Sequence, residues 1–128
     1  MRLRIALAVT MAAVVAAVGV PAAAVAGPSD NESATVAGVA SVPAGACPSG
    51  YFCLYTRPNY TGRMFKLYYC RDYAMSHWNG VGSGRNNNTG DAMAWLLDQY
   101  KQARFRYDAG YSNPRQDFRP IWYAKACL

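Results

Sequence analysis

The stretch Cys47–Arg63, CPSGYFCLYTRPNYTGR, decides the fold. It contains a run of strand-forming residues, Tyr51–Tyr55, directly after a Pro-Ser-Gly turn. The Arg-Pro-Asn tripeptide that follows predicts a second turn, because proline presets its own φ. Tyr55, Tyr60 and Gly62 then follow the spacing aromatic, four residues, aromatic, one residue, glycine. This spacing predicts a folded-over hairpin, in which a ring packs on the backbone where glycine offers no side chain.

A looser copy of this spacing lies in the second half of the chain, at Tyr107, Tyr111 and Asn113. The copy is one residue shorter, and Asn113 stands where Gly62 stands in the first. Asparagine tolerates positive φ better than most residues with a side chain. The repeat predicts two similar half-domains.

Strand patterns continue outward from the first hairpin. Arg63–Cys70 alternates imperfectly between its two faces, Gln102–Asp108 alternates cleanly, and Ile121–Cys127 reads as a closing strand. Ala92–Tyr100 fits either a buried strand or a helical turn. Several short strands with frequent turns predict an all-β Greek-key sandwich.

The first 26 residues have the pattern of a secretory signal peptide. Arg2 and Arg4 precede the uncharged apolar run Ile5–Val20, and Ala24 and Ala26 provide the small residues of a cleavage site. A retained membrane anchor is the alternative, but the run is short for one, since a spanning helix needs about 20 apolar residues. We therefore expect a secreted, extracellular protein with no membrane span after cleavage.

The segment after the signal peptide, Gly27–Gly45, is small, polar and free of aromatic residues. It predicts a flexible leader, which places the folded domain at residues 46–128. Without Arg2 and Arg4 the mature chain has 11 Lys and Arg against 7 Asp and Glu, a charge of +4. This excess would favour an acidic surface, although solubility alone explains it as well, and we expect no nucleic-acid partner.

Four cysteines lie inside the expected domain. A domain of about 80 residues is small enough to benefit from covalent cross-links. An even number in a small exported domain predicts two disulfides, and four cysteines allow three pairings. We favour one bridge at the start of the domain and one from the last strand to the first half. The spacings do not fit the paired knuckles of a zinc site. The favoured pairs are Cys47–Cys53 and Cys70–Cys127.

The spacing of Tyr55, Tyr60 and Gly62 resembles the βγ-crystallin Greek-key signature. The longer stretch Cys47–Arg63 resembles, more specifically, peptidase inhibitor family I36. That family consists of secreted bacterial proteins with a βγ-crystallin-like fold, and its characterised member inhibits metalloproteases. The resemblance implies a monomeric peptidase inhibitor with an extracellular zinc metalloprotease as partner. It does not carry over an inhibitory site, because the small disulfide loop that holds the reactive bond in the family has no matching cysteine pair here.

Many βγ-crystallins bind calcium through an Asn/Asp pair followed by a pair of hydroxyl residues. The corresponding region here is Asn88–Trp95, in which Met93 and Ala94 replace the hydroxyl pair. Calcium needs six to eight oxygen ligands. We therefore expect no metal site and no cofactor.

The segment Arg71–Gly90 has no periodicity and is rich in glycine and asparagine, which predicts a long loop. We expect this loop to fill a protease cleft, with one end fixed at Cys70, because preorganisation raises affinity. The alternative is that its aromatic residues roof the core and that its histidine is simply solvated. The candidate binding residues are Tyr73, Met75, His77 and Trp78.

No catalytic residues are expected. His77 is the only histidine of the chain and has no sequence partners typical of a nucleophile and base. An inhibitor is therefore favoured over an enzyme. The alternative function is a secreted crystallin-fold protein directed to a cell wall or membrane, like killer toxins, and a purely structural crystallin domain is the third hypothesis.

Overall fold

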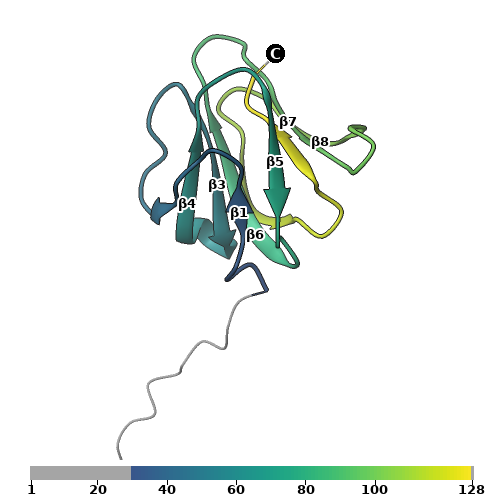
Figure 1. Ribbon diagram of the computed structural model, residues 1–128. Helices are drawn as coiled ribbons and strands as arrows, with labels where there is room; N and C mark the ends of the chain where they lie inside the picture. Colours follow the sequence, from purple (N-terminus) through teal and green to yellow (C-terminus); the bar gives the residue numbers. More distant parts are fainter. Residues whose placement is uncertain (1–29, 128) are drawn as a thin grey trace, which may run out of the picture.

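The structure is a computed structural model that describes residues 30–127 (Figure 1). The expected signal peptide, residues 1–26, lies outside the described residues. No helix in residues 30–127 is long and apolar enough to cross a membrane. The described chain forms ten strands and a one-turn 3-10 helix, η1: β1 (Thr35–Val36), β2 (Val42–Pro43), β3 (Tyr51–Arg57), η1 (Pro58–Tyr60), β4 (Thr61–Leu67), β5 (Asp72–Ser76), β6 (Val81–Asn87), β7 (Ala94–Leu97), β8 (Ala103–Tyr107), β9 (Ser112–Asp117) and β10 (Tyr123–Lys125).

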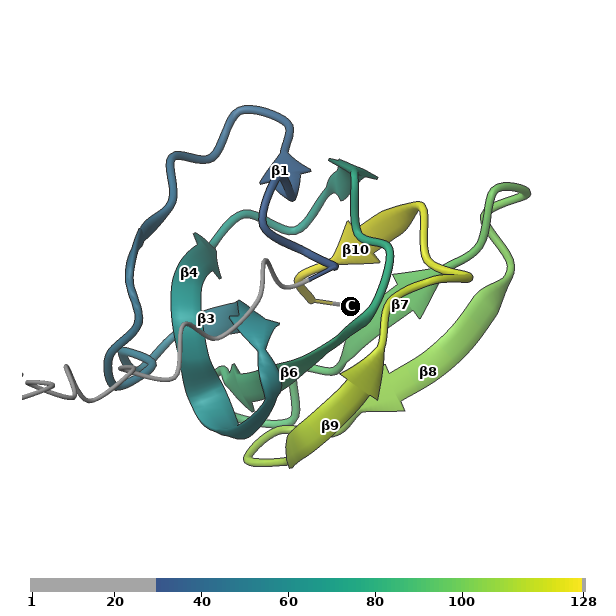
Figure 2. The ribbon, with the colours of Figure 1, turned by 90° about the horizontal axis from the view of Figure 1, so that it is seen from below.

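The strands form two antiparallel sheets of five, in the orders β1-β5-β10-β7-β8 and β2-β4-β3-β6-β9. The two halves of the chain are built alike. A hairpin, β3–β4 or β7–β8, is followed by a strand in the other sheet, β5 or β9, and then by a strand that returns beside the first, β6 or β10 (Figure 2). The all-β prediction is confirmed, and this connectivity is consistent with two Greek keys of the crystallin kind.

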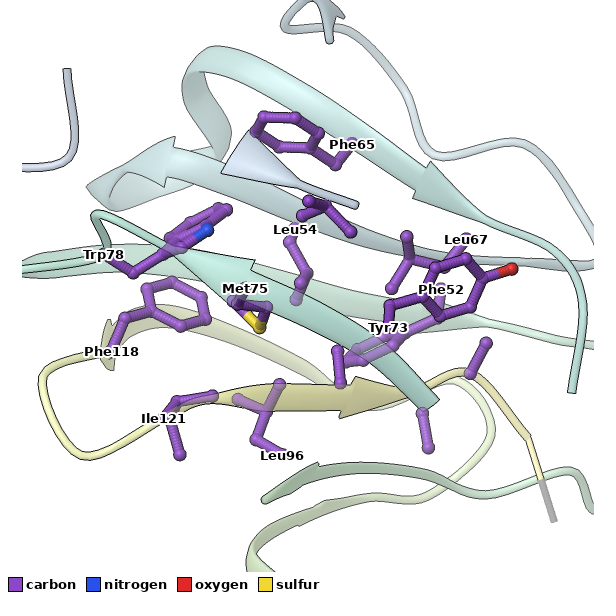
Figure 3. Close-up of a cluster of buried hydrophobic side chains, with 14 of the residues drawn as sticks. Phe52, Leu54, Phe65, Leu67, Tyr73, Met75, Trp78, Leu96, Phe118 and Ile121 are labelled. Carbon is purple, nitrogen blue, oxygen red and sulfur yellow. The ribbon is translucent and has the colours of Figure 1, made fainter. Parts of the chain in front are cut away.

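The main core lies between the two sheets, as Figure 3 shows. Successive side chains of a strand point to opposite faces, so alternate residues of each strand reach this core. Phe52 and Leu54 of β3 meet Tyr73 and Met75 of β5 and Leu96 of β7 in one buried cluster. A second, smaller cluster on the other face of β3 contains Cys53 and Tyr55.

Two disulfides are present, Cys47–Cys53 and Cys70–Cys127. The first closes a short loop at the start of β3, and the second joins the β4–β5 connection to the end of the chain. The second closes a loop with a sequence separation of 57. A loop of this length contributes roughly 4 kcal/mol to stability in the chain-entropy model.

The β3–β4 hairpin folds over at Tyr55, Tyr60 and Gly62. The two tyrosine rings pack edge to face with centroids 5.5 Å apart. The hydroxyl of Ser83 in β6 accepts the Tyr60 N–H at 2.8 Å and donates to the Arg57 carbonyl at 2.7 Å. Gly62 has a φ of +84°, and a Cβ there would collide with the Thr56 hydroxyl.

We expect Gly62→Ala to destabilise the protein by about 3 kcal/mol, because it adds left-handed backbone strain to a steric collision. Urea unfolding measures the change. Gly45→Ala is the matched control, since φ at Gly45 is not in the left-handed region and nothing lies within 4 Å of the added Cβ. Equal stability of the two variants would contradict this description of the hairpin.

The second aromatic copy occupies a different place from the first. Tyr107 and Tyr111 also pack edge to face, at 5.2 Å, but they lie where the chain crosses from β8 to β9. The hairpin equivalent to β3–β4 is β7–β8, so the repeat in the sequence is not the repeat in the fold. The Tyr107 hydroxyl is buried and donates to Gln116 Oε1 at 2.6 Å, and burial raises the pKa of this phenol above its usual range.

The interpretation of Gly27–Gly45 as a flexible leader is wrong for its described part, residues 30–45. β1 pairs with β5 and β2 pairs with β4, and Ala34 and Val36 are buried in the main core. Small and β-branched residues are sufficient to cover an exposed sheet edge, so the absence of aromatics did not mean the absence of structure. The folded unit therefore begins before residue 46.

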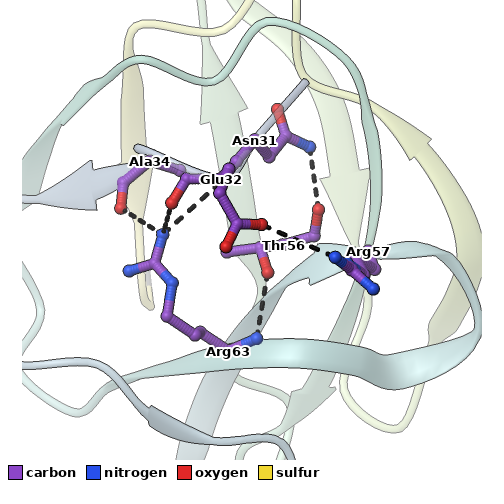
Figure 4. A network of polar contacts seen from close by, with 6 residues as sticks. All are labelled: Asn31, Glu32, Ala34, Thr56, Arg57 and Arg63. Atoms are coloured by element: carbon purple, nitrogen blue, oxygen red, sulfur yellow. Dashed lines mark hydrogen bonds and ion pairs between the residues drawn. The ribbon is translucent and has the colours of Figure 1, made fainter. Parts of the chain in front are cut away.

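Residues 30–37, which we call the N-terminal strap, are held by polar contacts (Figure 4). Nη2 of Arg63 donates to the carbonyls of Glu32 at 2.7 Å and Ala34 at 3.0 Å, with a longer contact to Asn31 at 3.4 Å. The buried Asn31 side chain donates to the Thr56 carbonyl and accepts the Gly80 N–H. These contacts fasten the strap to β3, to β4 and to the turn before β6.

The prediction of a long loop at Arg71–Gly90 is also wrong, because this segment contains β5 and β6. β6 escaped the pattern analysis because its inward positions include glycines. At Gly82 an added Cβ would collide with the Tyr55 carbonyl and lie 2.7 Å from the Phe118 ring. At Gly84 it would lie 2.9 Å from the Tyr107 hydroxyl. The glycines admit large neighbours, and a strand with such positions has no hydrophobic periodicity.

Candidate functional site

The residues expected to anchor a partner are mostly inside the protein. Tyr73, Met75 and Trp78 are only 3%, 6% and 4% exposed, and the Trp78 indole donates to the Thr35 carbonyl at 2.9 Å. They roof the core, which was the alternative reading. Of the four candidate binding residues, only His77 is exposed. It lies in the β5–β6 turn with a φ of +62°.

The most prominent projection is the tip of the β7–β8 hairpin, residues 98–102, which we call the hairpin tip. It extends from the edge of its sheet, as Figure 2 shows. Tyr100 at its end is 74% exposed, more than any other large hydrophobic side chain in residues 30–127. The preceding strand β7 lies in the window that the sequence left open between strand and helix, and it is a strand.

Asp98 holds the hairpin tip in one conformation. Its carboxylate Oδ1 accepts the backbone N–H groups of Tyr100 at 2.9 Å and Gln102 at 3.0 Å. The Asp98 N–H donates to the Gln102 carbonyl, and the Asp98 carbonyl accepts the Lys101 N–H. Arg104 lies 3.7 Å from the other carboxylate oxygen. The backbone of the tip is therefore ordered before any partner arrives.

Lys101 fixes the base of the tip to the sheet. Its φ is +61°, and its ammonium group lies 3.3 Å from Asp72 and 5.0 Å from the centre of the Tyr123 ring. Lys101 thereby ties the tip to β5 and β10.

Two open hollows flank an exposed tryptophan beside the tip. Trp122, 51% exposed, is shared by both hollows and stands in the β9–β10 connection. The first, of about 230 Å³, is lined by Asp98, Gln99, Tyr100, Arg104, Pro120 and Trp122. The second, of about 190 Å³, is lined by Met75, His77, Trp78, Asn79, Arg119, Ile121 and Trp122. His77 and the edges of Met75 and Trp78 thus border the site without forming its projecting part.

The sequence analysis missed Asp98, Tyr100 and Trp122. Asp98 carries a signal that could have identified the tip, because an aspartate that accepts N–H groups two residues on is typical of a tight turn. Trp122 carries no such signal, since its position depends on how the chain crosses between the sheets. No group of three or more His, Cys, Asp or Glu side chains in residues 30–127 is placed to hold a metal ion.

The described residues thus form a small, disulfide-linked all-β sandwich that exposes an ordered hairpin tip. The chain belongs to peptidase inhibitor family I36, whose family model matches residues 40–112 and so more than half of the 128-residue chain. The match includes the β7–β8 hairpin. A family of peptidase inhibitors is not a family of enzymes. A search of the curated proteins gave no match, and a search of the solved structures gave none either.

Proposed function

We propose that the protein is secreted and inhibits an extracellular zinc metalloprotease by inserting the hairpin tip into the substrate cleft. The observation that carries this proposal is the pair of backbone hydrogen bonds that the Asp98 carboxylate accepts. They order the backbone on both sides of the exposed Tyr100. A preorganised loop loses little conformational entropy on binding. Tyrosine is also enriched among residues that dominate binding energy.

The sheet edge next to the tip offers a second mode of contact. Within residues 30–127, β8 is the last strand of its sheet, and one side of its backbone has no strand partner there. An extended segment at a free sheet edge can pair with a strand of another protein. The hairpin tip and β8 together would lie along the cleft, with Trp122 and Arg104 at its rim. The zinc metalloprotease as target rests on the resemblance of Cys47–Arg63 to family I36.

The test is inhibition of a thermolysin-like zinc protease by the purified, oxidised chain that begins at residue 27, with a serine protease as control. We expect selective inhibition that saturates with inhibitor concentration. Absence of inhibition of either enzyme up to high micromolar concentration would contradict the proposal. Inhibition of the serine protease alone would contradict the choice of target class.

Asp98→Ala should weaken inhibition about tenfold, because a tip that must be ordered on binding loses roughly 1.4 kcal/mol of affinity. Asp91→Ala is the matched control, since Asp91 is exposed and precedes β7, at the end of that strand away from the tip. Inhibition constants of the two variants give the comparison. If Asp98→Ala inhibited as well as Asp91→Ala, preorganisation of the tip would play no part.

A further inference from the structure

A second aromatic surface lies on the other sheet, away from the hairpin tip. Tyr51, Tyr68 and Tyr69, which we call the tyrosine step, gather at one end of β3 and β4. Tyr51 and Tyr68 have ring centroids 5.2 Å apart, and Tyr68 and Tyr69 are 5.3 Å apart and nearly perpendicular, at 86°. Tyr68 and Tyr69 are 56% and 67% exposed. Two rings at right angles present one flat face and one edge to a ligand.

The tyrosine step is held by both disulfides. Tyr51 lies within the loop closed by Cys47–Cys53, and Tyr68 and Tyr69 directly precede Cys70 of the other bridge. The Tyr69 N–H also donates to the hydroxyl of the buried Tyr73 at 3.0 Å. The rings therefore stand on a backbone that is rigid at both ends.

Positive charge without an acidic partner lies beside these rings. The Lys66 ammonium is 5.7 Å from the centre of the Tyr51 ring. Arg85 is exposed on β6, and both Lys66 and Arg85 are register partners of Cys53 on its two sides. Within residues 30–127 neither cation has a carboxylate within 4.0 Å.

The cations near the hairpin differ in this respect. Lys101, Arg104 and Arg106 each have a carboxylate partner, Asp72, Asp98 or Asp108. Charge that is neutralised within the protein attracts an anionic ligand less than charge that is not. The sheet of β3, β4 and β6 is therefore the face on which an anion would be attracted.

We propose that the tyrosine step binds an acidic polysaccharide. The C–H groups of a sugar ring carry partial positive charge and pack on the negative face of an aromatic ring. Tyrosine hydroxyls can exchange hydrogen bonds with sugar hydroxyls. Lys66 and Arg85 pair with the carboxylates of the polymer. An open step without an enclosing pocket suits a long chain, which passes across it, better than a small molecule.

This inference is independent of the proposed inhibition, because the tyrosine step and the hairpin tip are on different sheets. A protein with both sites could be retained on an acidic matrix or wall polymer while its hairpin remains free for a protease. The two activities should therefore separate in single variants.

Affinity electrophoresis in gels containing polygalacturonate tests the proposal, with fully methyl-esterified polygalacturonate as the uncharged probe of the same backbone. We expect the oxidised protein to be retarded by the acidic polymer, less by the ester, and progressively less as salt rises. Lys66→Gln and the double variant Tyr68→Ala/Tyr69→Ala should each weaken binding at least tenfold. Tyr100→Ala should bind the polymer normally.

Several results would overturn the proposal. These are the absence of retardation at low salt, equal retardation by both polymers, and equal binding by the variants and the native protein. Binding to vesicles of anionic phospholipid without binding to the polymer would assign the face to a membrane instead. Thermal unfolding of Lys66→Gln shows whether that variant is folded, so its result is interpretable even if the double tyrosine variant is unstable.

Discussion

Tyr100→Ala should weaken protease inhibition about 100-fold, since removal of a dominant aromatic contact costs a binding interface about 2–4 kcal/mol. Tyr100 is the most exposed large hydrophobic side chain of the described residues and stands on a backbone held by Asp98. Its loss should leave the fold intact, because it makes no contact with the core. Inhibition constants measured against a thermolysin-like zinc protease give the effect.

The matched control for this variant is Tyr69→Ala. Tyr69 is also highly exposed, at 67%, but lies in the β4–β5 connection. We expect Tyr69→Ala to inhibit as the native protein does. If the two variants lost inhibition equally, the hairpin tip would not be the contact that distinguishes the site, and the tyrosine step would become the stronger candidate.

Removal of the N-terminal strap should have the largest effect on stability. The free energy of unfolding of a chain that begins at residue 38 should be about 4 kcal/mol lower than that of a chain that begins at residue 30. The shorter chain loses buried apolar surface and buried hydrogen bonds. Ala34 and Val36 are almost fully buried, and Asn31 makes two buried hydrogen bonds. The truncation also leaves the Trp78 indole without its acceptor at Thr35.

Urea unfolding of the two chains measures this difference. A chain that begins at residue 30 keeps every described contact, so it controls for the loss of residues 1–29. Arg63→Gln gives a milder test, because it removes the guanidinium that joins the strap to β4. Equal stability of both truncated chains would restore the interpretation of this segment as a flexible leader.

The first hairpin could be predicted from sequence because its determinants are local. A proline turn, two aromatics and a glycine at fixed spacing define β3–β4, and the strands found there begin or end within a few residues of those expected. The clean alternation of Gln102–Asp108 likewise predicted a strand, which is β8. The expected closing strand at Ile121–Cys127 is shorter, as β10, because the Ile121 N–H donates to the Phe118 carbonyl and closes the turn after β9.

The elements that were missed depend on distant residues. β6 is a strand whose glycines admit the rings of Tyr107 and Phe118, which approach from other parts of the chain. The strap is ordered by Arg63, about thirty residues away. No local pattern records such contacts, so both segments resembled loops.

The same reason explains the error about the site. Aromatic residues in an apparent loop suggested exposed anchors, but once β5 is a strand, Tyr73 and Met75 face the core. The exposed hairpin tip is short, and its residues 98–100 belong to a window that fitted two kinds of structure. Its position at a sheet edge, on which the proposed role depends, follows only from the order of the strands.

The central claim is that the hairpin tip is the part of the molecule that enters the protease. Amide hydrogen exchange of the inhibitor, free and bound to an inactivated zinc protease, tests this most directly. We predict new protection at residues 98–107 and around Trp122, with little change in β3, β4 and β6. Protection confined to the tyrosine step or the N-terminal strap, with the hairpin unchanged, would contradict the claim.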